Sequence, residues 1–244
     1  MNIFSLSVII PAYNETETIK DTIKKVSQYL RDNFSLYEII VVDDGSTDNT
    51  YQLVSELLEK VDNLKVIKND QNLGKGFSVR KGVLAAEFDY VLFSDADLST
   101  PIAEFDKFIP YLKKNIDIVI GSRALKESQI LKSQGLMREK AGKFVNLLIQ
   151  LILFRGIKDT QCGFKVFKRK VARQLFQLQK IDRFCFDAEV LYLAKKLGYS
   201  IAEIPIRWIN RQNSRVSFRR DSARVLAELI SIRRNQAKGF YEQK

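Results

Sequence analysis

Residues 89–101 read DYVLFSDADLSTP, a short apolar run that ends in two carboxylates one residue apart. The run from Tyr90 to Phe93 has the length and composition of a buried β-strand. Asp95 and Asp97 follow at its carboxyl end. Carboxylates this close repel each other, whereas a hard divalent cation can bind both and leave room for water and substrate phosphates. Taken alone, an Asp-x-Asp pair is also common in turns and helix caps.

The segments around this strand alternate between apolar runs and the periodicity of amphipathic helices. Runs suited to strands come at residues 6–12, 37–46, 64–69, 90–97 and 116–123. Helical periodicity separates them at residues 17–33, 50–60, 74–87 and 102–115. Strands that lack apolar–polar alternation and are separated by helices favour a mostly parallel sheet covered on both faces. The sequence therefore predicts an α/β fold.

The second half of the chain is less regular. We expect helices at residues 137–156, 186–198 and 219–239, and strands at residues 162–168 and 199–209. Gly198 is suited to end the second of these helices. In the last helix, one stripe is formed by Val225, Leu226, Leu229 and Ile230.

An apolar segment, FVNLLIQLILF at residues 144–154, lies within the first of these helices. It is much shorter than the roughly 20 apolar residues that span a bilayer. Lys140, Lys143 and Arg155 flank it. Such a segment either packs in the core or lies in a membrane interface, and the sequence leaves both open.

Three polar clusters follow predicted strands, at Pro11–Glu15, Asp43–Ser46 and Asp95–Ser99. Ligands of parallel sheets bind outside the carboxyl ends of the strands, so we expect the clusters to meet at one edge. A fourth segment, NLGKGFSVRKG, lacks the spacing of a Walker A loop. Its two glycines allow close backbone approach, and its Lys75 could reach a phosphate.

Part of these clusters has an ordinary structural explanation. Ser46, Thr47 or Asp48 can cap the helix at 50–60, and Asn14 can cap the helix at 17–33. This leaves Tyr13, Glu15 and Asp44 unexplained. Asp44 could accept a hydrogen bond from an N–H of a nucleobase.

Composition limits the chemistry. The 244 residues include 45% hydrophobic residues, four prolines and no linker-like stretch, which favours a single domain. The absence of histidine excludes an imidazole base and a histidine-ligated zinc site. Cys162 and Cys185 are expected to be free thiols, with Cys162 packed in the core. Trp208 and Phe164 are also expected in the core.

Charge is unevenly distributed. Residues 1–122 carry 13 Lys and Arg against 19 Asp and Glu, whereas residues 123–244 carry 27 against 10. A basic half suggests an anionic partner such as nucleic acid, a membrane surface or a phosphorylated substrate. A nucleic-acid-binding module would explain the charge but not the acidic strand ends, and no nucleic-acid-binding motif is present. We expect no nucleic-acid partner.

Several motifs together resemble family 2 glycosyltransferases of the GT-A, Rossmann-like fold. They are VIIPAYNE (8–15), VVDDGSTDNT (41–50), NLGKG (72–76), DADLSTP (95–101) and GSR (121–123). Further on, DTQCGFKVF (159–167), the segment from Phe184 to Trp208, and NSRVSF (213–218) resemble the polyprenyl-phosphate sugar transferases, above all the dolichyl-phosphate β-glucosyltransferases. The transmembrane helices of many relatives have no counterpart in this sequence.

The resemblance implies a role for individual positions. Residues implied to line the nucleotide pocket are Pro11, Tyr13, Glu15, Asp44 and Lys75. Asp95 and Asp97 would bind Mg²⁺ or Mn²⁺, with Asp97 as the direct ligand; Ser99 stands where mannosyl relatives carry a glutamine. Residues implied to bind donor and acceptor phosphates are Arg123, Arg138 and Arg215. Asp159 and Gln161 would contact the sugar hydroxyls.

We therefore expect one GT-A domain over residues 1–244, with a nucleotide- and metal-binding half (1–122) and a basic acceptor-binding half (123–244) that faces the membrane. The expected reaction transfers glucose from UDP-glucose to a polyprenyl phosphate, with inversion, at the cytoplasmic face of a membrane. The protein would be peripheral, without a transmembrane helix. A phosphate monoester is already an oxyanion near neutral pH, so no strong base is required. Arg219, Arg220, Arg233 and Arg234 are expected at the solvated surface or at lipid headgroups.

Three alternatives stay open. The donor could be GDP-mannose. The acceptor could be a soluble or polysaccharide hydroxyl, which needs a base, and Asp187 or Glu189 would then supply it. A non-catalytic protein that binds a nucleotide sugar or a lipid phosphate is the third, and the intact Asp-x-Asp motif argues against it.

Overall fold

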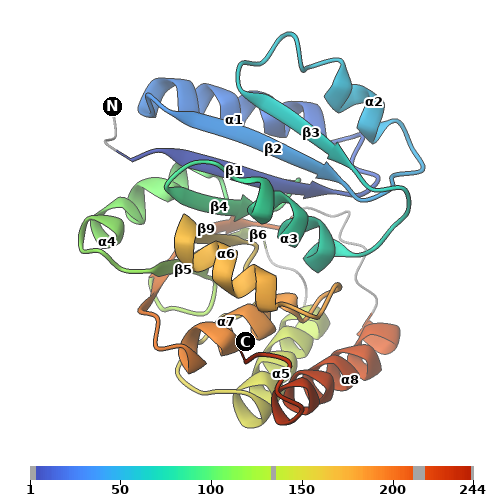
Figure 1. Ribbon diagram of the computed structural model, residues 1–244, viewed down its shortest axis with the longest axis vertical. Helices are drawn as coiled ribbons and strands as arrows, with labels where there is room; N and C mark the ends of the chain where they lie inside the picture. Colours follow the sequence, from blue (N-terminus) through green and yellow to red (C-terminus); the bar gives the residue numbers. More distant parts are fainter. Residues whose placement is uncertain (1–3, 133–135, 211–217, 243–244) are drawn as a thin grey trace.

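The computed structural model describes residues 4–132, 136–210 and 218–242 (Figure 1). Its centre is a seven-stranded sheet with the order β3-β2-β1-β4-β7-β5-β8. These strands are β1 Leu6–Ala12, β2 Tyr37–Asp43, β3 Leu64–Lys68, β4 Tyr90–Ser94, β5 Ile118–Ser122, β7 Phe164–Lys168 and β8 Ile201–Pro205. Only β7 runs antiparallel to its neighbours, β4 and β5. The predicted α/β fold with a mostly parallel sheet is confirmed.

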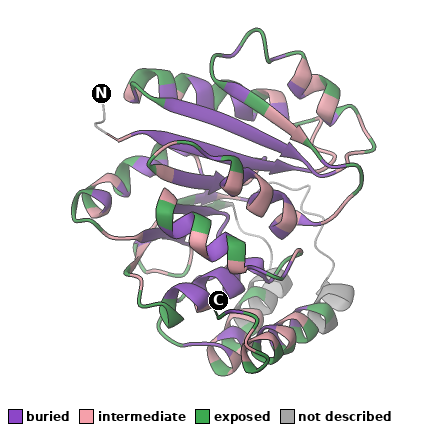
Figure 2. Cartoon of the chain, viewed as in Figure 1, coloured by how far each residue is buried: buried purple, intermediate pink, exposed green. Residues whose placement is uncertain are grey.

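Helices cover both faces of the sheet, and each face has its own apolar core. Along β1, Ile9 belongs to one core, whereas Val8 and Ile10 belong to the other. Figure 2 shows the central strands as almost wholly buried. On the face of Val8 lie α1 Ile19–Asn33, α2 Thr50–Ser55, the 3₁₀ helix η1 Ile102–Lys107 and α4 Ile109–Lys113. On the face of Ile9 lie α3 Lys75–Ala85, α5 Leu136–Ile152, α6 Arg169–Leu178, α7 Phe186–Lys196 and α8 Phe218–Ala237.

The structure departs from the predicted elements in five places. The helix expected at 50–60 ends at Ser55, and the one expected at 102–115 is divided into η1 and α4, with Pro110 in the first turn of α4. The strand expected at 199–209 is divided at Pro205: β8 joins the main sheet, and β9 Arg207–Ile209 pairs with β6 Gln129–Lys132 in a separate two-stranded sheet. The sequence analysis missed β6 and α6.

The helices α5 and α8 lie side by side at the end of the molecule opposite β3 (Figure 1). Arg233 on α8 donates from Nε to the carbonyl of Ile152 at 2.5 Å. The predicted stripe on α8 is only half buried, because Val225 and Leu229 face the core while Leu226 and Ile230 are exposed. Among the described residues, no helix is both long and apolar enough to cross a bilayer.

A row of aromatic rings supports the strand that carries the Asp-x-Asp motif. Phe108 is fully buried, with its ring centroid 5.4 Å from that of Phe164 and 6.2 Å from that of Phe105. Phe164 begins β7 and pairs with Ser94, the last residue of β4. Packing between η1 and the sheet therefore holds the end of β4.

Replacing Phe108 with alanine should lower the free energy of unfolding by about 3–5 kcal/mol, since a fully buried phenyl ring is lost and a cavity is left. Urea denaturation of both proteins measures the difference. Leu36→Ala is the control, because Leu36 is 60% exposed and should change stability by less than about 0.5 kcal/mol. Equal effects of the two substitutions would contradict this account of the aromatic row.

Candidate active site

The first two polar clusters meet at the carboxyl edge of the sheet, because β1 and β2 are adjacent and parallel. The N–H of Asn14 donates to Ser46 Oγ at 2.9 Å, and the N–H of Thr47 donates to Asn14 Oδ1 at 2.7 Å. The N–H of Asp44 donates to the carbonyl of Ala12 at 2.8 Å. The prediction that the polar clusters meet at one edge is confirmed for these two. Asn14 thus links two loops, and the prediction that it caps the first helix is wrong, because the N-cap residue of α1 is Thr18.

Asp44 is buried and organises the loop before α3. Its Oδ1 accepts hydrogen bonds from Asn69 Nδ2 (2.9 Å) and from the N–H of Leu73 (3.0 Å), and its Oδ2 accepts one from the N–H of Gly74 (2.9 Å). A carboxylate offers about four acceptor sites, so these bonds leave one for a ligand. Contact between Asp44 and a nucleobase stays a prediction.

Gly74 allows this loop to reach α3. Its φ is +110°, in the region that favours glycine, and a methyl group here would collide with the carbonyl of Asp182. The next residue, Lys75, begins α3 and places its Nζ 2.5 Å from Asp95 Oδ1. Burial alone would lower the pKa of Lys75, but the charges of Asp95 and Asp187 raise it above its usual value. The fourth polar cluster thus joins the Asp-x-Asp motif.

Asp97 is fixed by Ser99, which donates to it from its N–H (2.8 Å) and from its Oγ (2.7 Å). Burial raises the pKa of Asp97, and the nearby charge of Asp95 raises it further. A cation beside Asp97 would therefore stabilise the charged form of this carboxylate. Asp97 keeps acceptor sites beyond the two that Ser99 uses.

Gly163, the residue before β7, makes room for the other carboxylate. Its carbonyl accepts a hydrogen bond from the N–H of Asp95 at 3.2 Å, and a methyl group in place of its hydrogen would occupy the space of the Asp95 carboxylate. The motif DTQCGF thus shapes the Asp-x-Asp site directly. This role of Gly163 was not predicted from the sequence.

The site fits a hard divalent cation. The donor atoms of Asp95 and Asp97 are all oxygen, and Gly163 leaves space for the Asp95 carboxylate. Within the described residues, no group of three or more acidic or thiol side chains surrounds a potential ion site. Magnesium-type sites commonly use one or two carboxylates and complete the coordination with water and substrate phosphates. Asp95 and Asp97 are the residues that would hold the cation.

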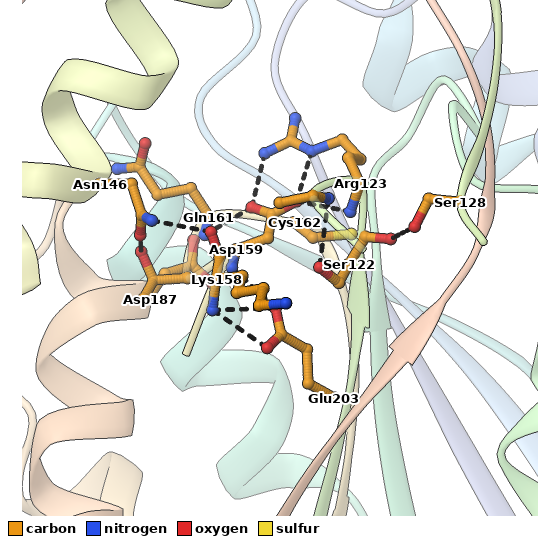
Figure 3. Close-up of polar contacts among 12 residues, drawn as sticks. Ser122, Arg123, Ser128, Asn146, Lys158, Asp159, Gln161, Cys162, Asp187 and Glu203 are labelled. Atoms are coloured by element: carbon orange, nitrogen blue, oxygen red, sulfur yellow. Dashed lines mark hydrogen bonds and ion pairs between the residues drawn. The ribbon is translucent and has the colours of Figure 1, made fainter. Parts of the chain in front are cut away.

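Arg123, at the end of β5, forms a bidentate ion pair with Asp159 (Figure 3). Its Nε and Nη2 donate to Oδ2 (2.7 Å) and Oδ1 (2.9 Å) of Asp159, and its backbone N–H donates to Oδ2 (2.9 Å). The guanidinium also lies 5.6 Å from the ring of Trp208, which is buried as predicted. Although burial opposes it, the pKa of Asp159 is lowered by the charge of Arg123. Both groups are charged.

The remaining predicted site residues are placed as follows. Pro11 is buried in β1, and Tyr13 and Glu15 are half-buried in the loop that follows it, where Glu15 Oε2 accepts a hydrogen bond from Thr18. The N–H of Gln161 donates to Asp159 Oδ1 at 3.3 Å. Arg215 and the side chain of Arg138 lie outside the described part of the chain. The roles assigned to these residues stay predictions.

A buried ion pair behind the site was not predicted. Lys165, in the middle of β7, places its Nζ 2.5 Å from Asp187 Oδ1 and 2.6 Å from the carbonyl of Cys162. Burial raises the pKa of Asp187, although the charges of Lys165 and Lys75 oppose this. The signal was a lysine in the apolar run CGFKVFK, which needs a buried partner.

The two carboxylates considered as bases differ in position. Asp187 is within electrostatic reach of Lys75 and Asp95. Glu189 points to another part of the molecule: its oxygens accept the N–H groups of Lys180 and Ile181 and the hydroxyl of Tyr241. These bonds fix the chain before α7 and the C-terminal segment, so Glu189 has a structural role.

The cysteines are as expected. Cys162 and Cys185 are free and buried. Burial raises the pKa of Cys162 to about 12. Neither thiol is a nucleophile at neutral pH.

Comparison with known proteins identifies a family model and several relatives that the chain matches. The family model Glycosyl transferase family 2 matches residues 7–176. The dolichyl-phosphate beta-glucosyltransferase of Dictyostelium discoideum is 36% identical over 98% of this chain and 77% of its own length. The enzymes of the same name from Saccharomyces cerevisiae and Homo sapiens are 34% and 33% identical, over 97% and 86% of this chain and 76% and 69% of their own lengths.

Solved structures share the fold. The glucosyl-3-phosphoglycerate synthase of Mycobacterium tuberculosis, determined with Mn²⁺, UDP-glucose and phosphoglyceric acid, has a TM-score of 0.69 and 20% identity over 94% of this chain and 78% of its own. The mannosyl-3-phosphoglycerate synthase of Rubrobacter xylanophilus has a TM-score of 0.65 and 19% identity over 98% of this chain and 76% of its own. The predicted GT-A fold is confirmed.

Substituting Gly163 with alanine should displace the Asp95 carboxylate and weaken Mn²⁺ binding by about 10- to 100-fold, the usual cost of disturbing a residue that supports a metal ligand. Electron paramagnetic resonance titration of Mn²⁺ with saturating UDP measures the affinity. Gly142→Ala is the matched control, since a methyl group at Gly142 meets no atom within 4 Å. Unchanged Mn²⁺ affinity in a folded Gly163→Ala protein would contradict the assignment.

Proposed function

The chain belongs to glycosyl transferase family 2, and from this premise we propose that it is an inverting hexosyltransferase that moves glucose from UDP-glucose to a polyprenyl phosphate of the dolichyl type. One observation carries the proposal. The family model ends at residue 176, whereas 36% identity to a dolichyl-phosphate beta-glucosyltransferase extends over 98% of the chain, including the basic second half. Similarity in that half supports the same class of acceptor.

For the donor, we assign the nucleotide to the loops after β1 and β2. Pro11, Tyr13 and Glu15 would line the base and ribose, and Asp44, with its one remaining acceptor site, suits the N–H of uracil. Lys75 lies beside Asp95, so its ammonium is within reach of a diphosphate bound at the Asp-x-Asp motif. The pocket would therefore select a uridine nucleotide.

For the cation, we assign Mg²⁺ or Mn²⁺ to Asp95 and Asp97, whose carboxylate oxygens would hold it. When bound, such an ion stabilises the negative charge that develops on the departing nucleotide. The chain itself contributes Ser99, which fixes Asp97, and Lys75, which adds positive charge beside the leaving group.

For the reaction, an acceptor phosphate oxygen would bond to the anomeric carbon of glucose while the bond from that carbon to the diphosphate breaks. The electron pair leaves with UDP. The attacking phosphate is already ionised near neutral pH, so no base removes a proton. We assign Arg123, with Arg138 and Arg215, to the phosphates of donor and acceptor, because a planar guanidinium group can donate two hydrogen bonds to the oxygens of one phosphate.

One observation favours a second candidate, transfer to a sugar hydroxyl. Asp187 lies behind the Asp-x-Asp motif, and its pKa is raised chiefly by burial, which suits a general base. A hydroxyl acceptor requires such a base, whereas a phosphate acceptor does not.

For localisation, we propose that the exposed side of α5 and α8 rests on the cytoplasmic face of a membrane. Five large apolar side chains are exposed there: Phe144, Leu147, Leu151, Leu226 and Ile230. Exposed basic residues near them include Arg155, Arg224 and Arg234. An apolar stripe with basic neighbours is the pattern of helices that lie in an anionic interface.

The acceptor assignment is tested by incubating the protein with labelled UDP-glucose and either farnesyl phosphate or farnesol in detergent, with Mg²⁺. We expect glucosyl transfer to farnesyl phosphate only. Arg215→Ala should raise the KM for farnesyl phosphate about 10- to 100-fold, as for loss of a charge-assisted contact, while the KM for UDP-glucose stays the same. Arg234→Ala, a substitution on the exposed side of α8, is the control. Equal use of farnesol would reject the phosphate acceptor and favour Asp187 as a base.

The membrane assignment is tested with Leu147→Glu combined with Leu151→Glu. Each leucine buried in lipid contributes about 1.5–3 kcal/mol, so co-sedimentation with phosphatidylserine vesicles should fall at least about tenfold. Turnover on detergent-dissolved farnesyl phosphate should be retained. Leu36→Glu, between α1 and β2, should leave vesicle binding unchanged. If the double variant sediments like the parent protein, the surface that contacts the membrane is not the exposed side of α5.

A further inference from the structure

Glu203, on the edge strand β8, accepts hydrogen bonds from the loop at residues 158–159, which is distant from it in sequence (Figure 3). Its Oε1 and Oε2 accept the N–H of Lys158 at 3.1 and 3.0 Å, and its Oε1 also accepts the N–H of Asp159 at 2.8 Å. Hydrogen bonds to a charged acceptor are stronger than neutral ones. The backbone at 158–159 is therefore fixed by one carboxylate.

Because the backbone of Asp159 is fixed in this way, the position of its carboxylate is restricted as well. Both oxygens of Asp159 are fully engaged: Oδ2 accepts the backbone N–H and Nε of Arg123, and Oδ1 accepts Nη2 of Arg123 and the N–H of Gln161. A carboxylate offers about four acceptor sites, and all are occupied by the protein. A sugar hydroxyl could donate to Asp159 only after one of these bonds is broken.

Within the described residues, Asp159 holds one side of Arg123, and the guanidinium forms no hydrogen bond on the other side. Asp159 uses two of its five side-chain N–H groups, and the ring of Trp208 covers the guanidinium at 5.6 Å. The remaining three N–H groups, two on Nη1 and one on Nη2, form the edge opposite to Nε. An arginine held in this way presents a fixed pair of donors to an oxyanion.

We propose that Glu203 is a positioning residue that acts through Asp159 to aim Arg123 at a substrate phosphate. The proposal rests on the role of Arg123 in the proposed function. The phosphate belongs either to UDP or to the polyprenyl phosphate. Glu203 does not touch the substrate; it fixes the loop, the loop fixes Asp159, and Asp159 fixes Arg123.

A carboxylate on an edge strand also has a simpler explanation, since charge on an edge discourages pairing with other chains. That explanation requires only an exposed charge. It does not account for the direction of the carboxylate, which accepts backbone N–H groups of the site loop. Nor does it predict any dependence of ligand binding on Glu203.

The experiment is a double-mutant cycle of Glu203→Gln and Arg123→Ala, with binding of UDP and of farnesyl phosphate measured separately by calorimetry. Glutamine has nearly the same shape, but its amide group brings a donor toward backbone donors. We expect Glu203→Gln to raise the Kd of one probe about tenfold, and Arg123→Ala to raise the same Kd about a hundredfold. The double variant should bind within about twofold of Arg123→Ala, because coupled residues are non-additive.

The matched control is Asp117→Asn. Asp117 precedes β5, and its Oδ2 accepts a hydrogen bond from the N–H of Ser200 (3.0 Å), the residue before β8. This contact lies at the opposite end of the β5–β8 strand pair. It should leave both Kd values unchanged even if thermal stability falls. Should Glu203→Gln fail to fold, Asp159→Asn removes the charge of the carboxylate that pairs with Arg123 and should reproduce the expected loss of affinity.

The inference is overturned if Glu203→Gln binds both probes like the parent protein, if its effect adds in full to that of Arg123→Ala, or if Arg123→Ala changes neither Kd. Loss of affinity for UDP identifies the donor phosphate, and loss for farnesyl phosphate identifies the acceptor phosphate. Failure of the parent protein to transfer glucose would reject the proposed function, but the binding cycle would still decide the role of Glu203.

Discussion

The mutual repulsion of Asp95 and Asp97 is the constraint around which the site is arranged. Two carboxylates at the end of a buried strand are costly unless positive charge or hydrogen-bond donors surround them. Lys75 pairs with the first and Ser99 donates twice to the second. Ser99 lies in the same loop as the pair, whereas Lys75 begins α3, so the pair draws two segments of the chain to one place.

The loop at residues 158–163 has a similar organising effect on the second half of the site. Asp159 fixes Arg123, the carbonyl of Cys162 accepts Lys165, and Gly163 leaves space for Asp95. Six consecutive residues thus connect the guanidinium at the end of β5, the ion pair beneath the sheet and the Asp-x-Asp motif. These contacts explain why the loop contains a glycine and a buried aspartate.

The sequence predicted the fold class and the first five strands because their apolar runs are bounded by clear turn residues. It also predicted that Pro11–Glu15, Asp43–Ser46 and Asp95–Ser99 converge, which follows from parallel strands alone. It missed the Lys165–Asp187 pair and the role of Glu203, since partners 22 and 45 residues apart are brought together only by tertiary packing. The split of residues 199–209 into β8 and β9 was also missed, because the two strands are consecutive in the sequence and are distinguished by their partners in the folded chain.

The reversed direction of β7 has a consequence for how such a domain diversifies. In a wholly parallel sheet, only segments that follow a strand reach the active edge. Here the segment that precedes β7 reaches it too, so the long stretch between β5 and β7 starts and finishes at the site. Between its two ends, that stretch could change in length without moving β1, β2 or β4. One inverted strand thereby lets a long segment leave the site and return to it.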